Sequence, residues 1–287
     1  MLGDISYEEF VALSSAAAGV LTDADEGVVS ALRERCLLDG DAITDKGLEA
    51  LEPYRVKRAV IMAAGFGSRM VPITYSIPKP LVKVHGKRII DTILDALIAA
   101  GIEEIYVVRG YLAEQFDELL ADYPNITFVQ NDLYSDANNI SSIVAAREHL
   151  ANAYVCEADL FLNNPSLVTP YQYRSNYLGV PVAHTDDWCF ITEDHRITEL
   201  LIGADDCHHM FGISYWTAEE GAKLGPDAAA VMERQDGAQC YWDEVPLRAF
   251  PEHYSVYVRD CSFDDVAEID TFDELKQIDP TYNDWKA

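Results

Sequence analysis

A run of small residues followed by two cationic side chains is the part of this sequence best suited to chemistry. Ala63-Ala64-Gly65-Phe66-Gly67-Ser68-Arg69 follows the short apolar run 57–62, and Lys79 stands ten residues after Arg69, between two prolines. Small residues let the backbone approach a phosphate chain closely, and an arginine can hold a triphosphate through two parallel hydrogen bonds. The loop has neither the Gly-Lys-Ser/Thr of a Walker A loop nor, with Met70, the third glycine of a dinucleotide fingerprint. It therefore predicts a nucleotide-phosphate site.

The elements that must position this loop alternate between strands and helices. Apolar, β-branched runs predict strands at 57–62, 105–108, 127–129 and 153–156, and helical spacing predicts helices at 89–100, 112–121 and 140–150. This order implies an α/β fold with a mainly parallel, Rossmann-like sheet that is covered on both faces. Ligands of such sheets bind beyond the carboxyl ends of the strands. After residue 167 the pattern predicts only short strands and turns, and a final helix at 273–278.

Residues 1–55 have a different character and are predicted to form a separate helical domain before a catalytic domain at 56–287. Helical spacing at 6–13, 26–38 and 44–51 resembles a winged-helix module. The segment carries twelve acidic and four basic residues, a net charge of −8 that would repel DNA. Docking or dimerisation is the simpler interpretation, and the sequence leaves a homo-oligomer open.

Composition excludes several classes of protein. The 287-residue chain has a formal net charge of −28, which argues against nucleic acid as a partner. No apolar stretch is long enough to span a membrane, and the run 11–21 is short and flanked by acidic residues, so no membrane insertion is expected. The start of the chain lacks the basic residues of a signal peptide, and the six cysteines are scattered. We expect a cytoplasmic protein with reduced thiols.

The loop and Pro78-Lys79-Pro80-Leu81 together resemble the nucleotidyltransferases that activate sugar phosphates and alcohol phosphates with nucleoside triphosphates. Within that superfamily, residues 57–279 look most like bacterial choline-phosphate cytidylyltransferases. The matching segments include Asn138-Asn139-Ile140, Ala158-Asp159, Tyr241-Trp242-Asp243 and Glu268-Ile269-Asp270. Position 157 departs from the pattern, because many relatives have Asp there and this chain has Glu.

The resemblance implies Mg²⁺-dependent transfer of a cytidylyl group from CTP to phosphocholine, giving CDP-choline and pyrophosphate. The acceptor phosphate would attack the α-phosphorus in line, without a covalent relay on the protein. Asp159 and Asp270 match the metal ligands of the family, and Arg69 and Lys79 match its catalytic cations. Contacts with the nucleotide are expected from Ala63, Ala64, Gly65, Gly67, Ser68, Asn139 and Ser141.

A quaternary ammonium is best held by aromatic faces, and the second half of the chain is rich in them. The choline-binding residues are expected to be Trp188, Tyr241, Asp243 and Tyr215. Aromatic residues at strand spacing also occur in cores, and alternation turns only one ring of each Tyr-Trp pair toward a given face.

Other functions stay open at this point. A sugar-1-phosphate or phosphoethanolamine nucleotidyltransferase would use the same loop, and a nucleotide-sensing regulator would bind without turnover. Cys207-His208-His209 is a poor zinc motif, because adjacent histidines on a strand point to opposite faces, and an exposed loop is expected there.

Overall fold

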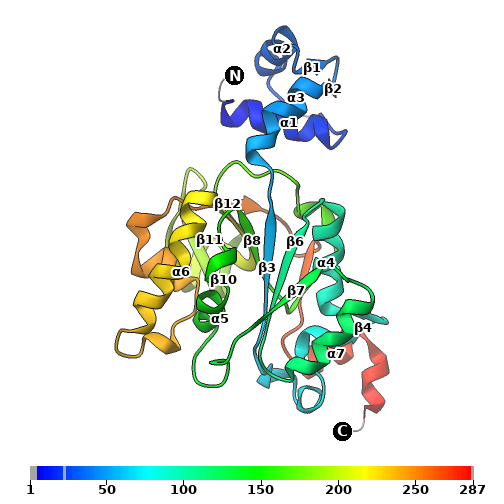
Figure 1. The fold of residues 1–287 in the computed structure, drawn as a ribbon, viewed down its shortest axis with the longest axis vertical. Coiled ribbons are helices and arrows are strands. Elements are labelled where there is room, and N and C mark those ends of the chain that lie inside the picture. The colour runs from blue at the N-terminus through cyan, green and yellow to red at the C-terminus, as the bar shows by residue number, and fades with distance from the viewer. Residues whose placement is uncertain (1–4, 22–23, 286–287) are drawn as a thin grey trace. The chain divides into compact units, whose positions relative to one another are not determined.

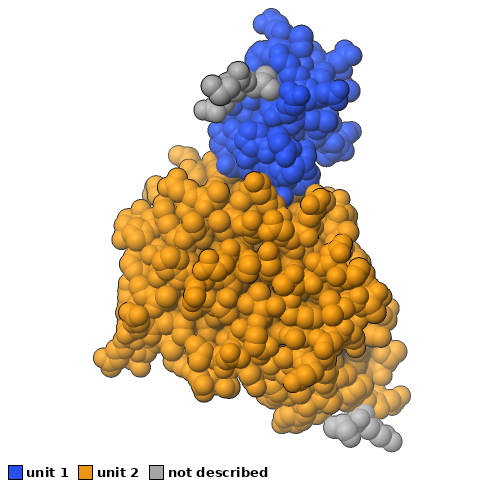
Figure 2. Space-filling model, in the orientation of Figure 1, with its two compact units in different colours: residues 1–56, 170–173 blue, residues 57–169, 174–287 orange. Residues whose placement is uncertain are grey.

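The computed structural model describes residues 5–21 and 24–285 of the chain. The chain divides into two compact units (Figure 2): an N-terminal unit, residues 1–56 with 170–173, and a large unit, residues 57–169 with 174–287. No sequence pattern indicated that residues 170–173 join the N-terminal unit. The expectation about the start of the chain, residues 1–4, lies outside the described residues. Among the described helices, none has the length and apolar character needed to cross a bilayer.

The described part of the N-terminal unit contains three α-helices, a small hairpin and a 3₁₀ turn at Glu52–Tyr54 (Figure 1). The elements are α1 (Tyr7–Ala17), α2 (Glu26–Glu34), β1 (Leu38–Asp39), β2 (Ala42–Ile43) and α3 (Asp45–Leu51). Each helix begins after a capping side chain, from Ser6, Asp25 and Thr44 respectively. Residues 170–173 join the unit through backbone hydrogen bonds, including one of 2.9 Å from the Gln172 N–H to the Tyr54 carbonyl. The hairpin was not predicted from the sequence.

The large unit is built on a seven-stranded sheet with the order β10-β12-β11-β8-β3-β6-β7 (Figure 1). Its strands are β3 (Arg58–Ala63), β6 (Glu104–Arg109), β7 (Ile126–Gln130), β8 (Ala153–Glu157), β10 (Asn176–Glu193), β11 (Arg196–Trp216) and β12 (Tyr257–Asp260). β3 pairs in parallel with β6 and β8, β6 pairs in parallel with β7, and β11 runs antiparallel to β8. The mainly parallel α/β sheet predicted from the sequence is confirmed.

Shorter elements surround this sheet. They are the strands β4 (Lys83–Val84), β5 (Lys87–Arg88), β9 (Leu160–Leu162) and β13 (Val266–Glu268) and the helices α4 (Ile89–Ala99), α5 (Ile140–Ala145), α6 (Ala218–Met232) and α7 (Phe272–Ile278). The segment predicted as a helix at 112–121 forms 3₁₀ turns over Ala113–Ala121 instead. Val60 and Ile61 of β3 are fully buried, as expected for a central strand with both faces covered.

The prediction of only short strands and turns after residue 167 was wrong in two places. β10 and β11 form a long antiparallel hairpin that closes through Asp194 and His195, both with positive φ (49° and 61°). Such a two-residue turn usually carries Asn-Gly or Asp-Gly, so this sequence gives no hairpin signal. The second miss is α6, which contains Gly221, Gly225 and Pro226, residues that usually weaken a helix. A Cβ at Gly221 would collide with Leu150, and a Cβ at Gly225 would collide with Arg147. Both glycines therefore let α6 pack closely against the segment 147–150.

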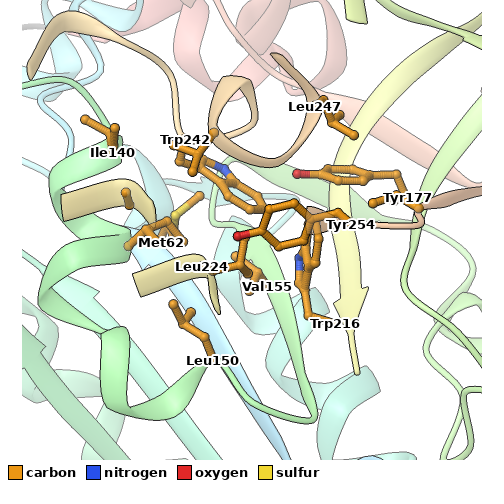
Figure 3. Close-up of a cluster of buried hydrophobic side chains, with 14 of the residues drawn as sticks. Met62, Ile140, Leu150, Val155, Tyr177, Trp216, Leu224, Trp242, Leu247 and Tyr254 are labelled. Atoms are coloured by element: carbon orange, nitrogen blue, oxygen red, sulfur yellow. The ribbon is translucent and has the colours of Figure 1, made fainter. Parts of the chain in front are cut away.

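Aromatic rings pack against one another within a buried hydrophobic cluster of the large unit (Figure 3). Trp216 is fully buried, and its ring centre lies 5.9 Å from those of Tyr177 and Trp242 and 5.7 Å from that of Tyr254. Its indole N–H donates to the Ser214 hydroxyl at 2.9 Å, so burial leaves no unpaired donor on this side chain. This cluster supports the segment that contains Tyr241 and Asp243.

We expect Trp216→Ala to lower the free energy of unfolding of the large unit by about 3–5 kcal/mol, because it removes a buried ring and leaves a cavity. Urea denaturation followed by tryptophan fluorescence measures this change. Ile202→Ala is the control, because Ile202 is 61% exposed and its truncation should change little. Equal losses in the two variants would contradict the proposed importance of this core.

Candidate active site

A cavity of about 720 Å³ opens at the carboxyl ends of β3 and β8, within the large unit. Its wall is formed by the loop after β3, the start of α5, the end of β8, the β10–β11 hairpin and the segments around Tyr241 and Glu268. This is where a ligand of a parallel sheet is expected. All the residues predicted to bind the nucleotide line it: Ala63, Ala64, Gly65, Gly67, Ser68, Asn139 and Ser141.

The loop after β3 is held against the segment that carries Lys79. Gly67 has a positive φ of 68°, and a Cβ there would lie 3.0 Å from the Cβ of Lys79. The Thr74 hydroxyl donates to the Gly67 carbonyl at 3.0 Å and fixes the turn from the other side. Around Gly65, by contrast, the space where a side chain would stand is open. Gly67 therefore serves the conformation of the loop, and Gly65 leaves the backbone accessible from the cavity.

Four charged side chains predicted from the sequence meet in this cavity. The Lys79 ammonium donates to Asp159 Oδ2 at 2.9 Å and to Asp270 Oδ1 at 2.8 Å, and Arg69 pairs with Asp270 Oδ2 at 2.7 Å. Lys79 is only 6% exposed. Burial alone would lower the pKa of Lys79, but the Asp159 and Asp270 carboxylates outweigh burial, so the pKa is raised and the charge is kept.

A third carboxylate, from Glu268, joins Asp159 and Asp270. One ligand oxygen from each of the three lies within 4.8 Å of the others. Asp159 Oδ1 is buried without a hydrogen-bond partner in the part of the chain that the structure describes. Mg²⁺ prefers such a set of oxygen ligands, so these residues fit the ion expected from the sequence. Sequence reasoning missed Glu268, although its place two residues before Asp270 was a usable signal.

The electrostatics around this group also favour a cation. Burial, followed by the charges of Asp159 and Asp270, raises the pKa of Glu268 to about 8. Burial and the nearby Asp159 likewise raise the pKa of Glu157. Like charges at close range cost free energy that a divalent ion would relieve. The structure thus gathers carboxyl groups whose raised pKa values a bound divalent ion would lower.

Glu157 is the position expected to depart from the family pattern, and the structure leaves room for its side chain. A Cβ at Gly212 of β11 would collide with the Glu157 side chain in its present position, so glycine at position 212 leaves room for it. The side-chain amide of Asn139 donates a hydrogen bond to Glu157 Oε1 at 3.4 Å. Glu157 lines the cavity, yet Glu268 rather than Glu157 joins Asp159 and Asp270 in the carboxylate group.

The cavity lining also contains three of the residues predicted to bind the acceptor, Trp188, Tyr241 and Asp243. The rings of Trp188 and Tyr241 meet edge to face, with centres 5.5 Å apart, and Tyr241 is 43% exposed. The Arg248 guanidinium lies over the Trp188 ring at 5.1 Å and already supplies one cation–π contact. The backbone N–H of Trp242 donates to Asn139 Oδ1 at 2.9 Å and joins this segment to the start of α5.

Tyr215 is a correction to the predicted set. It lies on β11 but outside the lining of the cavity, is 3% exposed, and packs on Tyr154 with ring centres 5.8 Å apart. Because the sheet is covered on both faces, alternation buries Tyr215 on one face and Trp216 on the other. The prediction treated one ring of this pair as available for a ligand, and neither is.

Asn139 and Ser141 line the cavity and also make hydrogen bonds that hold its wall together. The Ser141 hydroxyl donates to the Asn138 carbonyl at 2.8 Å and accepts from the amide of Asn131 at 2.9 Å. Asn131 follows β7, is buried, and was not identified from the sequence. A direct contact of Asn139 or Ser141 with the base or ribose stays a prediction.

Comparison with known proteins agrees with this geometry. Residues 58–172 match the family described as nucleotidyl transferase. The 2-aminoethylphosphonate cytidylyltransferase of Lancefieldella rimae is 37% identical over 228 residues, which cover 78% of this chain and 92% of that protein. The choline-phosphate cytidylyltransferase of Streptococcus pneumoniae is 30% identical over 224 residues, covering 77% of this chain and 96% of that protein. The chain belongs to the nucleotidyl transferase family.

A solved structure extends the likeness to the fold. The CTP:phosphocholine cytidylyltransferase from Streptococcus pneumoniae superimposes with a TM-score of 0.72 and 30% identity, covering 79% of this chain and 99% of that one.

We expect Lys79→Met to lower kcat for nucleotidyl transfer on the order of 10²-fold or more, because it removes a preorganised positive charge from the cavity. Pyrophosphate release measures the effect. Lys83→Met is the matched control, because Lys83 lies four residues away on the exposed side of β4. Turnover of Lys79→Met at the wild-type rate would exclude a catalytic role for this ammonium group.

Asp243 predicts a pH-dependent stability. Burial raises its pKa to about 7, although the Tyr177 hydroxyl, donating to Asp243 Oδ1 at 2.6 Å, opposes part of that rise. The folded protein therefore holds this proton more tightly than the unfolded chain, where the pKa of Asp is about 3.9. Stability contributed by the protonated group is lost as the pH rises from about 4 to about 7.

Asp243→Asn can still accept the Tyr177 hydrogen bond but does not titrate. The free energy of unfolding of this variant, minus that of the wild type, should therefore be larger at pH 8 than at pH 5. Urea denaturation at the two pH values measures the difference. A difference in stability that is the same at both pH values would mean that Asp243 does not carry the raised pKa.

Proposed function

We propose that this chain transfers a cytidylyl group from CTP to a small phosphate or phosphonate that bears a cationic amine, and that it releases pyrophosphate. Phosphocholine, giving CDP-choline, is the acceptor expected from the sequence. 2-Aminoethylphosphonate is the second candidate, favoured by the 37% identity to a relative with that name. One observation carries the proposal. The loop after β3, the Lys79–Asp159–Asp270 group and the residues Trp188, Tyr241 and Asp243 all line the same cavity.

The reaction needs no covalent intermediate on the protein. An oxygen of the acceptor phosphate or phosphonate would form a bond to the α-phosphorus of CTP, while the bond from that phosphorus to the bridging oxygen of pyrophosphate breaks. The acceptor oxygen is already ionised at neutral pH, so the proposal assigns no residue to removing a proton. The work of the chain is then to position two anions and to stabilise the charge that moves to the leaving group.

Arg69 and Lys79 would supply the protein's own positive charge. Lys79 is held by two carboxylates, so its ammonium group is in place before a substrate arrives. Arg69 is 65% exposed at its side chain and can move from Asp270 to a phosphate.

The lining holds two cations and six carboxyl groups: Glu157, Asp159, Asp187, Asp243, Glu268 and Asp270. Three of the six, Glu157, Asp243 and Glu268, have raised pKa values, and a bound divalent ion would favour their ionised forms. A triphosphate would be repelled by this wall on its own. Asp159, Glu268 and Asp270 would hold Mg²⁺, which neutralises phosphate charge when bound. This imbalance supports the proposed dependence on a divalent ion.

The cationic end of the acceptor would lie near Trp188, Tyr241 and Asp243. A quaternary ammonium group gains most from aromatic faces, and a primary ammonium group gains most from carboxylate acceptors. The cavity offers both, with one face of the Trp188 ring already covered by Arg248. A sugar-1-phosphate acceptor fits this surface less well, because sugar hydroxyls need a set of neutral polar partners.

The direct test is pyrophosphate release with Mg²⁺ across CTP, UTP, dTTP, ATP and GTP. Each nucleotide is paired with phosphocholine, phosphoethanolamine, 2-aminoethylphosphonate and glucose-1-phosphate. We expect turnover with CTP and an amine-bearing acceptor, and its loss when EDTA removes the metal. Turnover confined to glucose-1-phosphate would overturn the acceptor proposal. Binding of CTP without any turnover would favour a nucleotide-sensing regulator.

A further inference from the structure

A second group of metal-ligating side chains lies beside the carboxylate group, and it contains a histidine. Asp187, His209 and Glu268 each offer one ligand atom, and these atoms lie within 4.8 Å of one another. Glu268 is therefore shared between this group and the Asp159–Glu268–Asp270 group. The reaction proposed above requires neither Asp187 nor His209, so this cluster needs an explanation of its own.

Three strands bring the cluster together. Asp187 lies on β10, His209 on β11 and Glu268 on β13, and the β10–β11 pairing sets Cys189 opposite His209. The segment 205–209, expected to be an exposed loop, is thus part of a strand. The sequence argument about adjacent histidines holds for this strand. His208 Nε2 faces Asp260 at 3.5 Å and takes no part in the cluster.

The imidazole ring of His209 is held in position by its neighbours. The Thr185 hydroxyl lies 3.1 Å from His209 Nδ1, and the same hydroxyl accepts from the Asp187 N–H at 3.2 Å. Thr185 therefore contacts both the His209 ring and the backbone of Asp187, and with Nδ1 so engaged the proposed site would use Nε2 of His209. The ring also contacts Phe211 and Phe263, with centres 5.3 Å and 5.2 Å away. A partner on the second nitrogen of a histidine is what metal ligation usually requires.

We propose that Asp187, His209 and Glu268 form a second divalent-cation site, which takes Mn²⁺, Co²⁺ or Zn²⁺ in preference to Mg²⁺. Imidazole suits these ions, whereas Mg²⁺ favours oxygen ligands alone. The all-oxygen group formed by Asp159, Glu268 and Asp270 is then the magnesium site, and the shared Glu268 bridges the two. This inference goes beyond the proposed function and does not depend on the identity of the acceptor.

Mn²⁺ binding to the full chain, without nucleotide, tests the proposal. Electron paramagnetic resonance of free Mn²⁺ counts the bound ions, and excess Mg²⁺ is added to occupy the all-oxygen group. We expect the wild type to retain one Mn²⁺ per chain under this condition, and Zn²⁺ to displace it. His209→Gln should weaken the retained Mn²⁺ on the order of 10-fold or more.

Matched variants separate this site from its surroundings. His208→Gln changes the adjacent histidine, which faces Asp260, and should retain the Mn²⁺. Asp159→Asn should also retain it, whereas Glu268→Gln should weaken it. His209→Phe keeps the ring packing against Phe211 and Phe263, so it serves as a second variant if His209→Gln is unstable. Thermal melting without metal checks that each variant is folded.

Two results would overturn the inference. One is equal Mn²⁺ retention by the wild type and the two folded His209 variants. The other is a raised KM for an amine-bearing acceptor in His209→Gln with unchanged Mn²⁺ binding, which would assign the cluster to the ammonium group of the acceptor. Failure of cytidylyl transfer in the wild type leaves the count of bound Mn²⁺ unaffected, so the two proposals fail separately.

Discussion

The arrangement of this cavity depends on the ion pairs that the Lys79 ammonium group makes with Asp159 and Asp270. Burying a charged amine is costly unless hydrogen-bonded counter-ions surround it, and Asp159 and Asp270 provide them at 2.9 and 2.8 Å. One aspartate follows β8 and the other follows β13, so a single side chain joins segments far apart in the sequence. Gly67 rests on the stem of the same lysine, which places the loop after β3 within this arrangement. Loss of the amine would therefore disturb geometry as well as charge.

Local chemistry made part of this structure predictable. The strand before Ala63, the small-residue loop, and the paired cations Arg69 and Lys79 are all encoded within about twenty-five residues. Asp159 and Asp270 followed from family resemblance, since no local pattern joins residues more than a hundred positions apart. Glu268 and His209 escaped because their meaning depends on which strands come together in the fold. The β10–β11 hairpin escaped because Asp194 and His195 form its turn without glycine.

The choice among aromatic residues shows a second limit. Alternation along a strand tells which rings share a face but does not tell which face meets the cavity. In the pair Tyr241 and Trp242, the ring of Tyr241 is exposed and that of Trp242 is buried. At Tyr215 and Trp216 both rings are buried, because elements cover the sheet on each side. Only the three-dimensional neighbours, Tyr154 on one side and Tyr177 on the other, distinguish the two cases.

Glu157 and Gly212 lie on the neighbouring strands β8 and β11. The Glu157 carboxyl group occupies the space in which a side chain at position 212 would lie. A shorter side chain at position 157 would leave room for a Cβ at position 212, whereas glutamate at position 157 favours glycine at position 212. Two positions fifty-five residues apart should therefore covary among relatives, and that covariation would mark which of them share the geometry of this cavity.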